Sequence, residues 1–245
     1  MLHGKRILLI VSGGIAAYKS LELVRRLRER GASVRCVLTR GGAQFVTPLS
    51  LSALSEDKVY TDLFSLTDEA EMGHIQLSRD ADLLLVVPAS ADILAKMAHG
   101  QADDLATTAL LATDKDVMVA PAMNVRMWTH AATQANLATL RERGVHFVGP
   151  TDGDMACGEF GPGRMAEPLE IDAALDAQMT DGPSTGTHVL VPSGPTPKPT
   201  YPLRPLPNRS PGAPGPAPAR ALPGLGAHVT LPPRPALVPA PPRLG

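Results

Sequence analysis

The chain has 245 residues, of which 44% are hydrophobic and 19% charged, and its formal net charge at pH 7 is −1. Two cysteines exclude a disulfide framework, and no apolar run approaches the roughly 18 residues of a membrane span. The first residues lack the long apolar segment of a signal peptide. We therefore expect a soluble, cytoplasmic protein of one or two domains that does not associate with a membrane.

Composition changes sharply near residue 181. Nineteen of the 25 prolines follow residue 182, and that tail has six Lys and Arg residues but no Asp or Glu. Its cations are neither clustered nor interleaved with aromatic residues, which argues against nucleic-acid binding. We expect a folded domain over residues 1–181 and a separate tail over residues 182–245.

The first predicted unit is a strand, a glycine turn and a helix. Residues 5–11 (KRILLIV) are typical of a strand buried on both faces of a parallel sheet, and residues 21–31 have the apolar spacing of a helix. Between them, Ser12, Gly13 and Gly14 place backbone N–H groups at a helix N-terminus, which favours an anion. Such a turn either binds a phosphate or only packs tightly. It is not GxGxxG, which counts against a dinucleotide.

Further strands follow in alternation with helices. Residues 33–39 (SVRCVLT) predict the second strand, and Thr39 at its end can add a hydroxyl to the same phosphate. Residues 82–87 (DLLLVV) predict a buried strand that leads into a turn and a helix. The turn consists of Pro88, Ala89 and Ser90. This alternation predicts a doubly wound α/β fold, Rossmann-like or flavodoxin-like, in which helices cover both faces of a parallel sheet.

The octet PAMNVRMW, residues 121–128, follows a strand-like run (DVMVA). Asn124 is therefore expected at the carboxyl end of a parallel strand, where open α/β sheets bind ligands. Its carboxamide can grip a carboxylate beside apolar walls formed by Met123, Met127 and Trp128. The alternative is that Asn124 only caps the following helix.

Two more side chains are suited to proton transfer. His74, in Gly-His-Ile, can titrate near neutral pH, although a lone histidine is commonly structural. Cys157 lies in the Gly-rich stretch TDGDMACGEFGPGRMAEP, which favours a mobile loop with an accessible thiol. Arg164 in the same stretch holds this loop, binds a phosphate or forms a plain surface ion pair. We expect no metal site.

Together these motifs resemble the flavin-dependent cysteine decarboxylases. The octet is similar to their PxMNxxMW signature, the Pro-Ala-Ser turn to their second flavin motif, and ACGEFGPGRM to their substrate-recognition flap. From residue 5 to about residue 172, the chain resembles the flavoprotein half of the bifunctional phosphopantothenoylcysteine decarboxylase/phosphopantothenate-cysteine ligases of coenzyme A synthesis. It departs from them after the Pro-Ala-Ser turn, because the usual Asn of the family's second flavin motif is either replaced by Asp92 or offset.

The resemblance implies a carboxy-lyase with FMN as its cofactor, held by the glycine turn, Thr39 and the Pro-Ala-Ser turn. The implied reaction converts 4′-phosphopantothenoylcysteine to 4′-phosphopantetheine. In the family, FMN oxidises the cysteine moiety to a thioaldehyde, and carbon dioxide leaves to give an enethiolate. The reduced flavin then returns the hydride, so that no external electron acceptor is needed.

The resemblance also assigns residues and an assembly. His74 is the base, Asn124 holds the carboxylate, and Cys157 donates the last proton, while Met127 and Arg164 complete the expected substrate contacts. The family assembles as homotrimers and homododecamers, which we expect here. Two alternatives stay open: a peptidyl-cysteine decarboxylase, and a flavin-binding regulatory subunit without turnover.

The tail, residues 182–245, resembles a damaged start of the ligase half. The SGPT turn survives at residues 193–196, but the stretch expected to be helical has four prolines between residues 214 and 223. Each proline inside a helix costs about 3 kcal/mol. We therefore expect an extended, unfolded, polyproline-like remnant without ligase activity, with a genuine proline-rich linker as the alternative.

Overall fold

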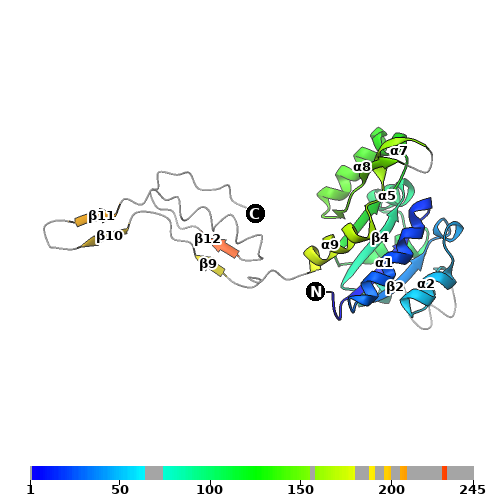
Figure 1. The fold of residues 1–245 in the computed structure, drawn as a ribbon, viewed down its shortest axis with the longest axis horizontal. Helices are drawn as coiled ribbons and strands as arrows, with labels where there is room; N and C mark the ends of the chain where they lie inside the picture. Colours follow the sequence, from blue (N-terminus) through cyan, green and yellow to red (C-terminus); the bar gives the residue numbers. More distant parts are fainter. Residues whose placement is uncertain are drawn as a thin grey trace. The chain divides into compact units, whose positions relative to one another are not determined.

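The computed structural model describes residues 2–63, 74–154 and 158–179, and beyond them the backbone of four short strands (Figure 1). The side chains of residues 74 and 75 are outside the described part. Contacts divide the chain into two units, Met1–Met179 and Thr180–Gly245.

Within the described residues of the first unit, six strands form one sheet, in the order β3-β2-β1-β4-β5-β6. Every neighbouring pair of these strands is parallel. The winding starts at β1 and proceeds to β3 on one side, then returns to β4 and proceeds to β6 on the other. The point of reversal therefore lies between β1 and β4, which is where doubly wound sheets bind ligands. The strands are β1 (Arg6–Val11), β2 (Ser33–Leu38), β3 (Val59–Tyr60), β4 (Leu83–Ala89), β5 (Val117–Pro121) and β6 (His146–Phe147).

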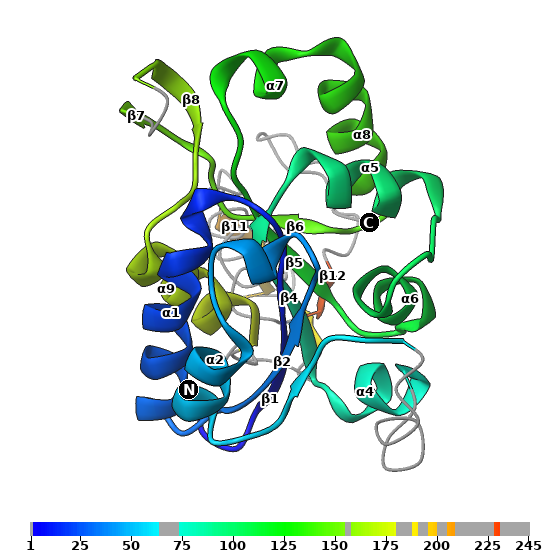
Figure 2. The same ribbon diagram turned by 90° about the vertical axis from the view of Figure 1, so that its right-hand side faces the viewer.

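Helices cover both faces of this sheet (Figure 2). One face is packed by α1 (Tyr18–Glu29), α2 (Pro48–Ser55) and α9 (Pro168–Met179). The opposite face is packed by α4 (His74–Asp80), α5 (Ala91–His99), α6 (Leu105–Ala112) and α8 (Ala131–Glu142). The remaining helical elements are two short 3-10 turns, η1 (Ile15–Ala17) and η2 (Gly42–Gln44), and α7 (Val125–Thr129).

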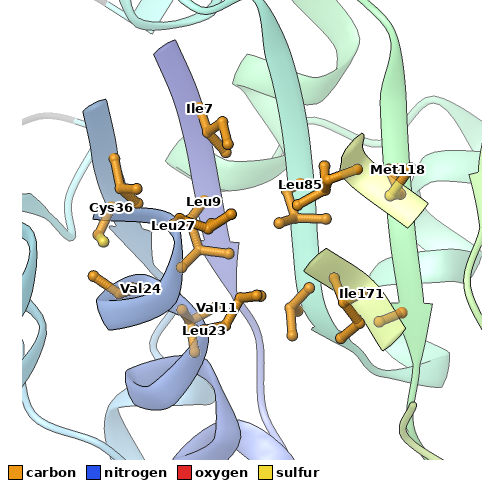
Figure 3. Packing of buried hydrophobic residues seen from close by; sticks show 14 of the residues in the cluster. Ile7, Leu9, Val11, Leu23, Val24, Leu27, Cys36, Leu85, Met118 and Ile171 are labelled. Carbon is orange, nitrogen blue, oxygen red and sulfur yellow. The ribbon is translucent and has the colours of Figure 1, made fainter. Parts of the chain in front are cut away.

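After Arg6, every residue of β1 is apolar and buried. Because successive side chains point to opposite faces of a strand, Leu9 lies beside Leu27 of α1 in the cluster that also contains Ile171 of α9 (Figure 3). Leu8 belongs to the other cluster, which contains Leu94 of α5. A strand with both faces covered has no polar side to show in its sequence. The predicted doubly wound α/β fold is confirmed.

The Gly-rich stretch predicted as a loop contains an antiparallel hairpin instead. Its strands are β7 (Thr151–Asp154) and β8 (Phe160–Arg164). Gly161 and Gly163 have φ angles of 148° and 131°, which side-chain-bearing residues rarely adopt. With glycines alternating along β8, the apolar alternation that identifies a strand is missing, so the sequence pattern gave no sign of it.

The described residues of the second unit form two strand pairs. β9 (His188–Leu190) pairs in parallel with β12 (His228–Thr230), and β10 (Thr196–Pro199) pairs antiparallel with β11 (Pro205–Asn208). The proline-rich stretch at residues 214–223 is outside the described residues, so its expected failure to form a helix stays a prediction. No described helix combines the length and the apolar character that crossing a membrane requires.

Candidate active site

A buried hydroxyl joins the two turns at the reversal point of the sheet. Ser12 Oγ donates to the main-chain oxygen of Pro88 at 2.7 Å and accepts from the N–H of Ser90 at 3.1 Å. Ser12 is only 2% exposed. The glycine turn after β1 and the Pro-Ala-Ser turn after β4 therefore form one continuous wall at the carboxyl edge of the sheet.

The glycine turn needs glycine for two different reasons. Gly14 has a φ of 143°, and a Cβ placed on it would meet nothing within 4 Å, so its backbone borders open space. At Gly13 the reason is close packing, because a Cβ there would lie 3.3 Å from the backbone of Gly41. The 3-10 turn η1 begins directly after the glycine turn and continues into α1, so only the first N–H groups of η1 have no partner within the helix. The turn thus offers backbone donors beside an open space.

Thr39 lies against this turn through the loop that follows it. Its Oγ1 donates to the main-chain oxygen of Val11 at 3.3 Å and accepts from the N–H of Gly42 at 3.0 Å. A Cβ on Gly42 would lie 2.4 Å from the oxygen of Val11, so no larger residue fits. Gly41 and Gly42 therefore pack at the same turn, which our sequence reasoning missed, and the signal for them is a second Gly-Gly pair that follows β2 after Thr39 and Arg40.

The Pro-Ala-Ser turn presents a single polar side chain. Pro88 and Ala89 close the fully buried strand β4, and Ser90 is the N-cap of α5. Ser90 Oγ accepts from the N–H of Ile93 at 3.4 Å and remains half-buried. Since capping uses only the oxygen as an acceptor, the hydroxyl proton can be donated to a ligand.

Asn124 caps a helix and also keeps its amide donors available. Its Oδ1 accepts from the N–H of Met127 at 2.8 Å at the start of α7. This bond orients the carboxamide, so the two N–H groups of Nδ2 point away from the helix. Met127 is 47% exposed, whereas Met123 and Trp128 pack against the core. Of the three predicted apolar walls, Met127 alone is largely exposed.

The β7–β8 hairpin stands at the same end of the sheet as α7 (Figure 2). The N–H of Met123 donates to the oxygen of Gly163 at 3.0 Å. Cys157 falls outside the described residues, between the two strands of this hairpin in sequence. His74 is the first residue of α4, and its side chain is not described. The predicted convergence of His74, Asn124 and Cys157 therefore stays a prediction.

Arg164 ends β8 in an ion pair, with Nη2 2.6 Å from Oε1 of Glu167. In the part of the chain that the structure describes, no three or more His, Cys, Asp or Glu side chains gather in a way that could hold a metal ion. Beside this ion pair, the described groups of the two turns and of α7 include the hydroxyls of Ser12, Thr39 and Ser90, the carboxamide of Asn124 and glycine backbone. Such a set suits hydrogen bonding to phosphate and carboxylate oxygens.

Comparison with known proteins gives two family matches. The family described as "Flavoprotein" matches residues 1–180, and the "DNA/pantothenate metabolism flavoprotein C-terminal domain" matches residues 184–244. The coenzyme A biosynthesis bifunctional protein CoaBC of Vibrio vulnificus is 47% identical over 240 residues, and that of Escherichia coli 48% over 242 residues. Each alignment covers 98% of this chain, which spans 60% of the length of these relatives.

Two solved structures also align with about 70% of the chain. A cysteine-to-serine mutant of PPC decarboxylase, complexed with pantothenoylaminoethenethiol, is 36% identical with a TM-score of 0.62. It aligns with 70% of this chain and over 96% of its own length. The FMN binding protein AtHal3 is also 36% identical, with a TM-score of 0.62, and aligns with 71% of this chain and 96% of its own. These matches confirm the resemblance predicted from the motifs: the chain belongs to the flavoprotein family.

Proposed function

We propose that this chain is an FMN-dependent decarboxylase that converts 4′-phosphopantothenoylcysteine to 4′-phosphopantetheine in coenzyme A biosynthesis. The names of the curated relatives and the solved PPC decarboxylase support this assignment. The structural observation that carries it is the bond between Ser12 and Pro88, which joins two turns into one cradle at the ligand-binding edge of the sheet.

The residues at this edge fit a flavin nucleotide. A phosphate ester requires several N–H and O–H donors at one point, and the glycine turn supplies them next to the open space at Gly14. The half-buried hydroxyl of Ser90 stands on the other side of the same cradle. FMN, when bound, supplies the electron sink that the saturated carbon of the substrate lacks.

Asn124 is suited to hold the substrate carboxylate. A neutral carboxamide donates two hydrogen bonds but adds no positive charge. A cation in the same place would stabilise the ground-state carboxylate, whose charge has to leave that group as carbon dioxide forms, and would raise the barrier. Oδ1 is already engaged by the N–H of Met127, so the side that faces away from α7 consists of donors.

The proton transfers are assigned to two residues by the resemblance alone. His74 would accept the proton of the substrate thiol, and Cys157 would donate a proton to carbon in the last step. A neutral imidazole near pH 7 is a suitable acceptor for the first transfer. Met127 and Arg164 are proposed to contact the substrate.

Several further expectations belong to the same proposal. Residues 1–181 would form the decarboxylase domain, and residues 182–245 a remnant of the ligase domain without ligase activity. The chain would assemble as a homotrimer or homododecamer in the cytoplasm. The match of residues 184–244 to the C-terminal domain of the pantothenate flavoproteins supports the ligase origin of the tail.

One other substrate is favoured by a specific observation. The structure of the FMN-dependent cysteine decarboxylase SpaF is 31% identical with a TM-score of 0.59, and 99% of it is covered. A peptide with a C-terminal cysteine, the alternative substrate that the motif resemblance leaves open, is therefore kept as the second candidate. Flavin binding without turnover, as a regulatory subunit, is the third possibility to test.

The deciding experiment combines a visible spectrum with an assay of carbon dioxide release. The purified full chain should carry flavin absorbance bands and release carbon dioxide from 4′-phosphopantothenoylcysteine without an added electron acceptor. If carbon dioxide is released from a cysteine-terminated peptide but not from 4′-phosphopantothenoylcysteine, the peptide is the substrate. A yellow protein that is inactive on both substrates would indicate the regulatory role, and a protein that stays colourless with added FMN would contradict all three.

A further inference from the structure

Lys19 is a cation in an unfavourable position within its own helix. It occupies the first turn of α1, where the helix dipole disfavours positive charge, and its side chain is only 11% exposed. A largely buried ammonium group requires a partner. Lys19 finds it on another element: Nζ lies 2.9 Å from Oε1 of Glu167 and 3.5 Å from the main-chain oxygen of Met165.

Glu167 receives a second cation on the same oxygen. Arg164 Nη2 donates to Glu167 Oε1 at 2.6 Å, so one carboxylate oxygen accepts from residues of two different elements. These hydrogen bonds, first that of Lys19 and then that of Arg164, hold the pKa of Glu167 below its usual value. At neutral pH the carboxylate is therefore ionised and bound to both cations.

The backbone of Glu167 is fixed independently of its side chain. Its oxygen accepts from the N–H groups of Glu170 and Ile171 at the start of α9, at 2.9 and 3.1 Å. Its own N–H donates to Oε2 of Glu170 at 2.7 Å, as in the return bond of a capping box. Ile171 is completely buried under the sheet. The carboxylate therefore belongs to the residue directly before α9, a helix whose Ile171 packs in the core.

Arg164, in contrast, belongs to the hairpin. It is the last residue of β8, and its side chain crosses β7 so closely that a Cβ on Gly153 would lie 2.9 Å from Arg164 Cδ. Its main-chain oxygen also accepts a long bond from the hydroxyl of Thr151, at 3.5 Å. Through Arg164, the ion pair with Glu167 restrains both strands of the hairpin.

We propose that Glu167 is a positioning residue that fastens the β7–β8 hairpin, through Arg164, to the platform formed by Lys19 of α1 and the start of α9. The proposal rests on the decarboxylase function, because the segment that joins the two strands contains Cys157. Glu167 does not touch the reacting atoms in this scheme. It holds the described strands of the hairpin in place, and Cys157 lies between these two strands in the sequence.

Glu167→Gln tests this directly, because it keeps the size of the side chain and removes its charge. Amide hydrogen exchange in residues 158–164 should rise by about two- to five-fold, as expected for the loss of a half-exposed ion pair, while exchange in β1 should not change. The matched control is Glu29→Gln at the last residue of α1, which removes the exposed ion pair with Arg25 at 3.0 Å, ten residues along the helix from Lys19. This control should leave exchange in the hairpin unaltered.

A double-mutant cycle separates coupling from simple destabilisation. Lys19→Gln alone should also raise exchange in residues 158–164, and the double variant with Glu167→Gln should add little to either single change. Fully additive effects, or an equal rise of exchange throughout the first unit, would overturn the positioning role. Unchanged exchange in residues 158–164 of the Glu167→Gln variant would overturn it as well.

Steady-state kinetics of the same variant give a second readout. Glu167→Gln should lower kcat about ten-fold with little change in KM, because substrate still binds but the hairpin is less often in place. An increase in KM alone would contradict the proposal. If the unmodified chain releases no carbon dioxide, the decarboxylase assignment fails, and the exchange experiment still decides whether Glu167 fastens the hairpin.

Discussion

The hydroxyl of Ser12 donates a hydrogen bond of 2.7 Å to the main-chain oxygen of Pro88, across the point at which the winding of the sheet reverses. One strand-end residue thereby sets the spacing of two turns that are 76 positions apart in the sequence. The same hydroxyl accepts the N–H of Ser90, so its loss leaves one buried and one partly buried main-chain group without this partner.

Ser12→Ala should therefore cost stability and cofactor affinity together. We expect the free energy of unfolding to fall by about 1–3 kcal/mol, the usual effect of leaving buried polar groups unpaired. FMN affinity, followed by the quenching of flavin fluorescence on titration, should fall as the turns separate. Ser20→Ala is the matched control, since buried Ser20 Oγ donates to the oxygen of Val87, also at 2.7 Å, but on α1. It should lose similar stability and keep FMN affinity; an equal loss of affinity in both variants would contradict the role given to Ser12.

Gly42→Ala should displace the loop that carries Thr39. The added methyl group would be 2.4 Å from the oxygen of Val11 and 2.8 Å from the side chain of Leu38, so the backbone must move. Overpacking of this kind costs about 1–3 kcal/mol, which chemical denaturation can measure. Gly144→Ala, at a φ of 84° with open space around it, tests backbone strain without a clash. Weakened FMN binding is expected for Gly42→Ala and not for Gly144→Ala.

Asn124→Asp separates capping from substrate binding. Asp is as good an N-cap as Asn, so the melting temperature should change little. The carboxylate removes both N–H donors and repels the substrate carboxylate, so kcat/KM for carbon dioxide release should fall by roughly 100-fold or more. Asn124→Ala should lose activity and also about 1 kcal/mol of stability through the lost cap. Full activity in the Asp variant would show that Asn124 is only a helix cap.

Cys157→Ser should leave FMN bound and stop the reaction late. A serine hydroxyl is a far weaker acid than a thiol, so the final protonation should fail and an oxidised intermediate should accumulate. The product mixture can be followed by mass spectrometry. Normal formation of 4′-phosphopantetheine by this variant would rule out Cys157 as the acid.

The two cysteines should differ in reactivity. Burial of Cys36 in β2 raises the pKa of its thiol to about 12, so at pH 8 it is protonated and shielded from reagents. A thiol reagent at pH 8 should therefore modify Cys157 and spare Cys36 until the chain is unfolded. Peptide mapping after labelling gives the answer, and the Cys157→Ser variant should take up no label in the folded state. Labelling of Cys36 in the folded chain would show that β2 opens readily.

The sequence predicted those parts of the fold whose signal is local. The uninterrupted apolar runs of β1 and β4 identified buried parallel strands, and the glycine pair after β1 identified a turn at the ligand edge. For Asn124, the capping and ligand-binding interpretations were set against each other. The structure shows that the cap uses only Oδ1, which leaves the binding role possible.

The missed features depend on residues that are distant in sequence or lack side chains. No pattern around Ser12 indicates that Pro88 will be its partner, and Lys19 and Glu167 are 148 positions apart. Strand β8 was missed because its glycines remove the alternation that predicts strands. Pairing of this kind is decided by the packing of the whole sheet, which no short window of sequence contains.

The cap formed by Asn124 has a consequence for how quickly a substrate can be bound productively. Since the bond to the N–H of Met127 already selects one of the two amide orientations, the donors need not rotate when a carboxylate arrives. Little side-chain entropy is lost when the carboxylate binds, because the cap bond has already ordered the Asn124 side chain during folding. A flexible donor such as Gln in the same place would have to be ordered anew in every catalytic cycle.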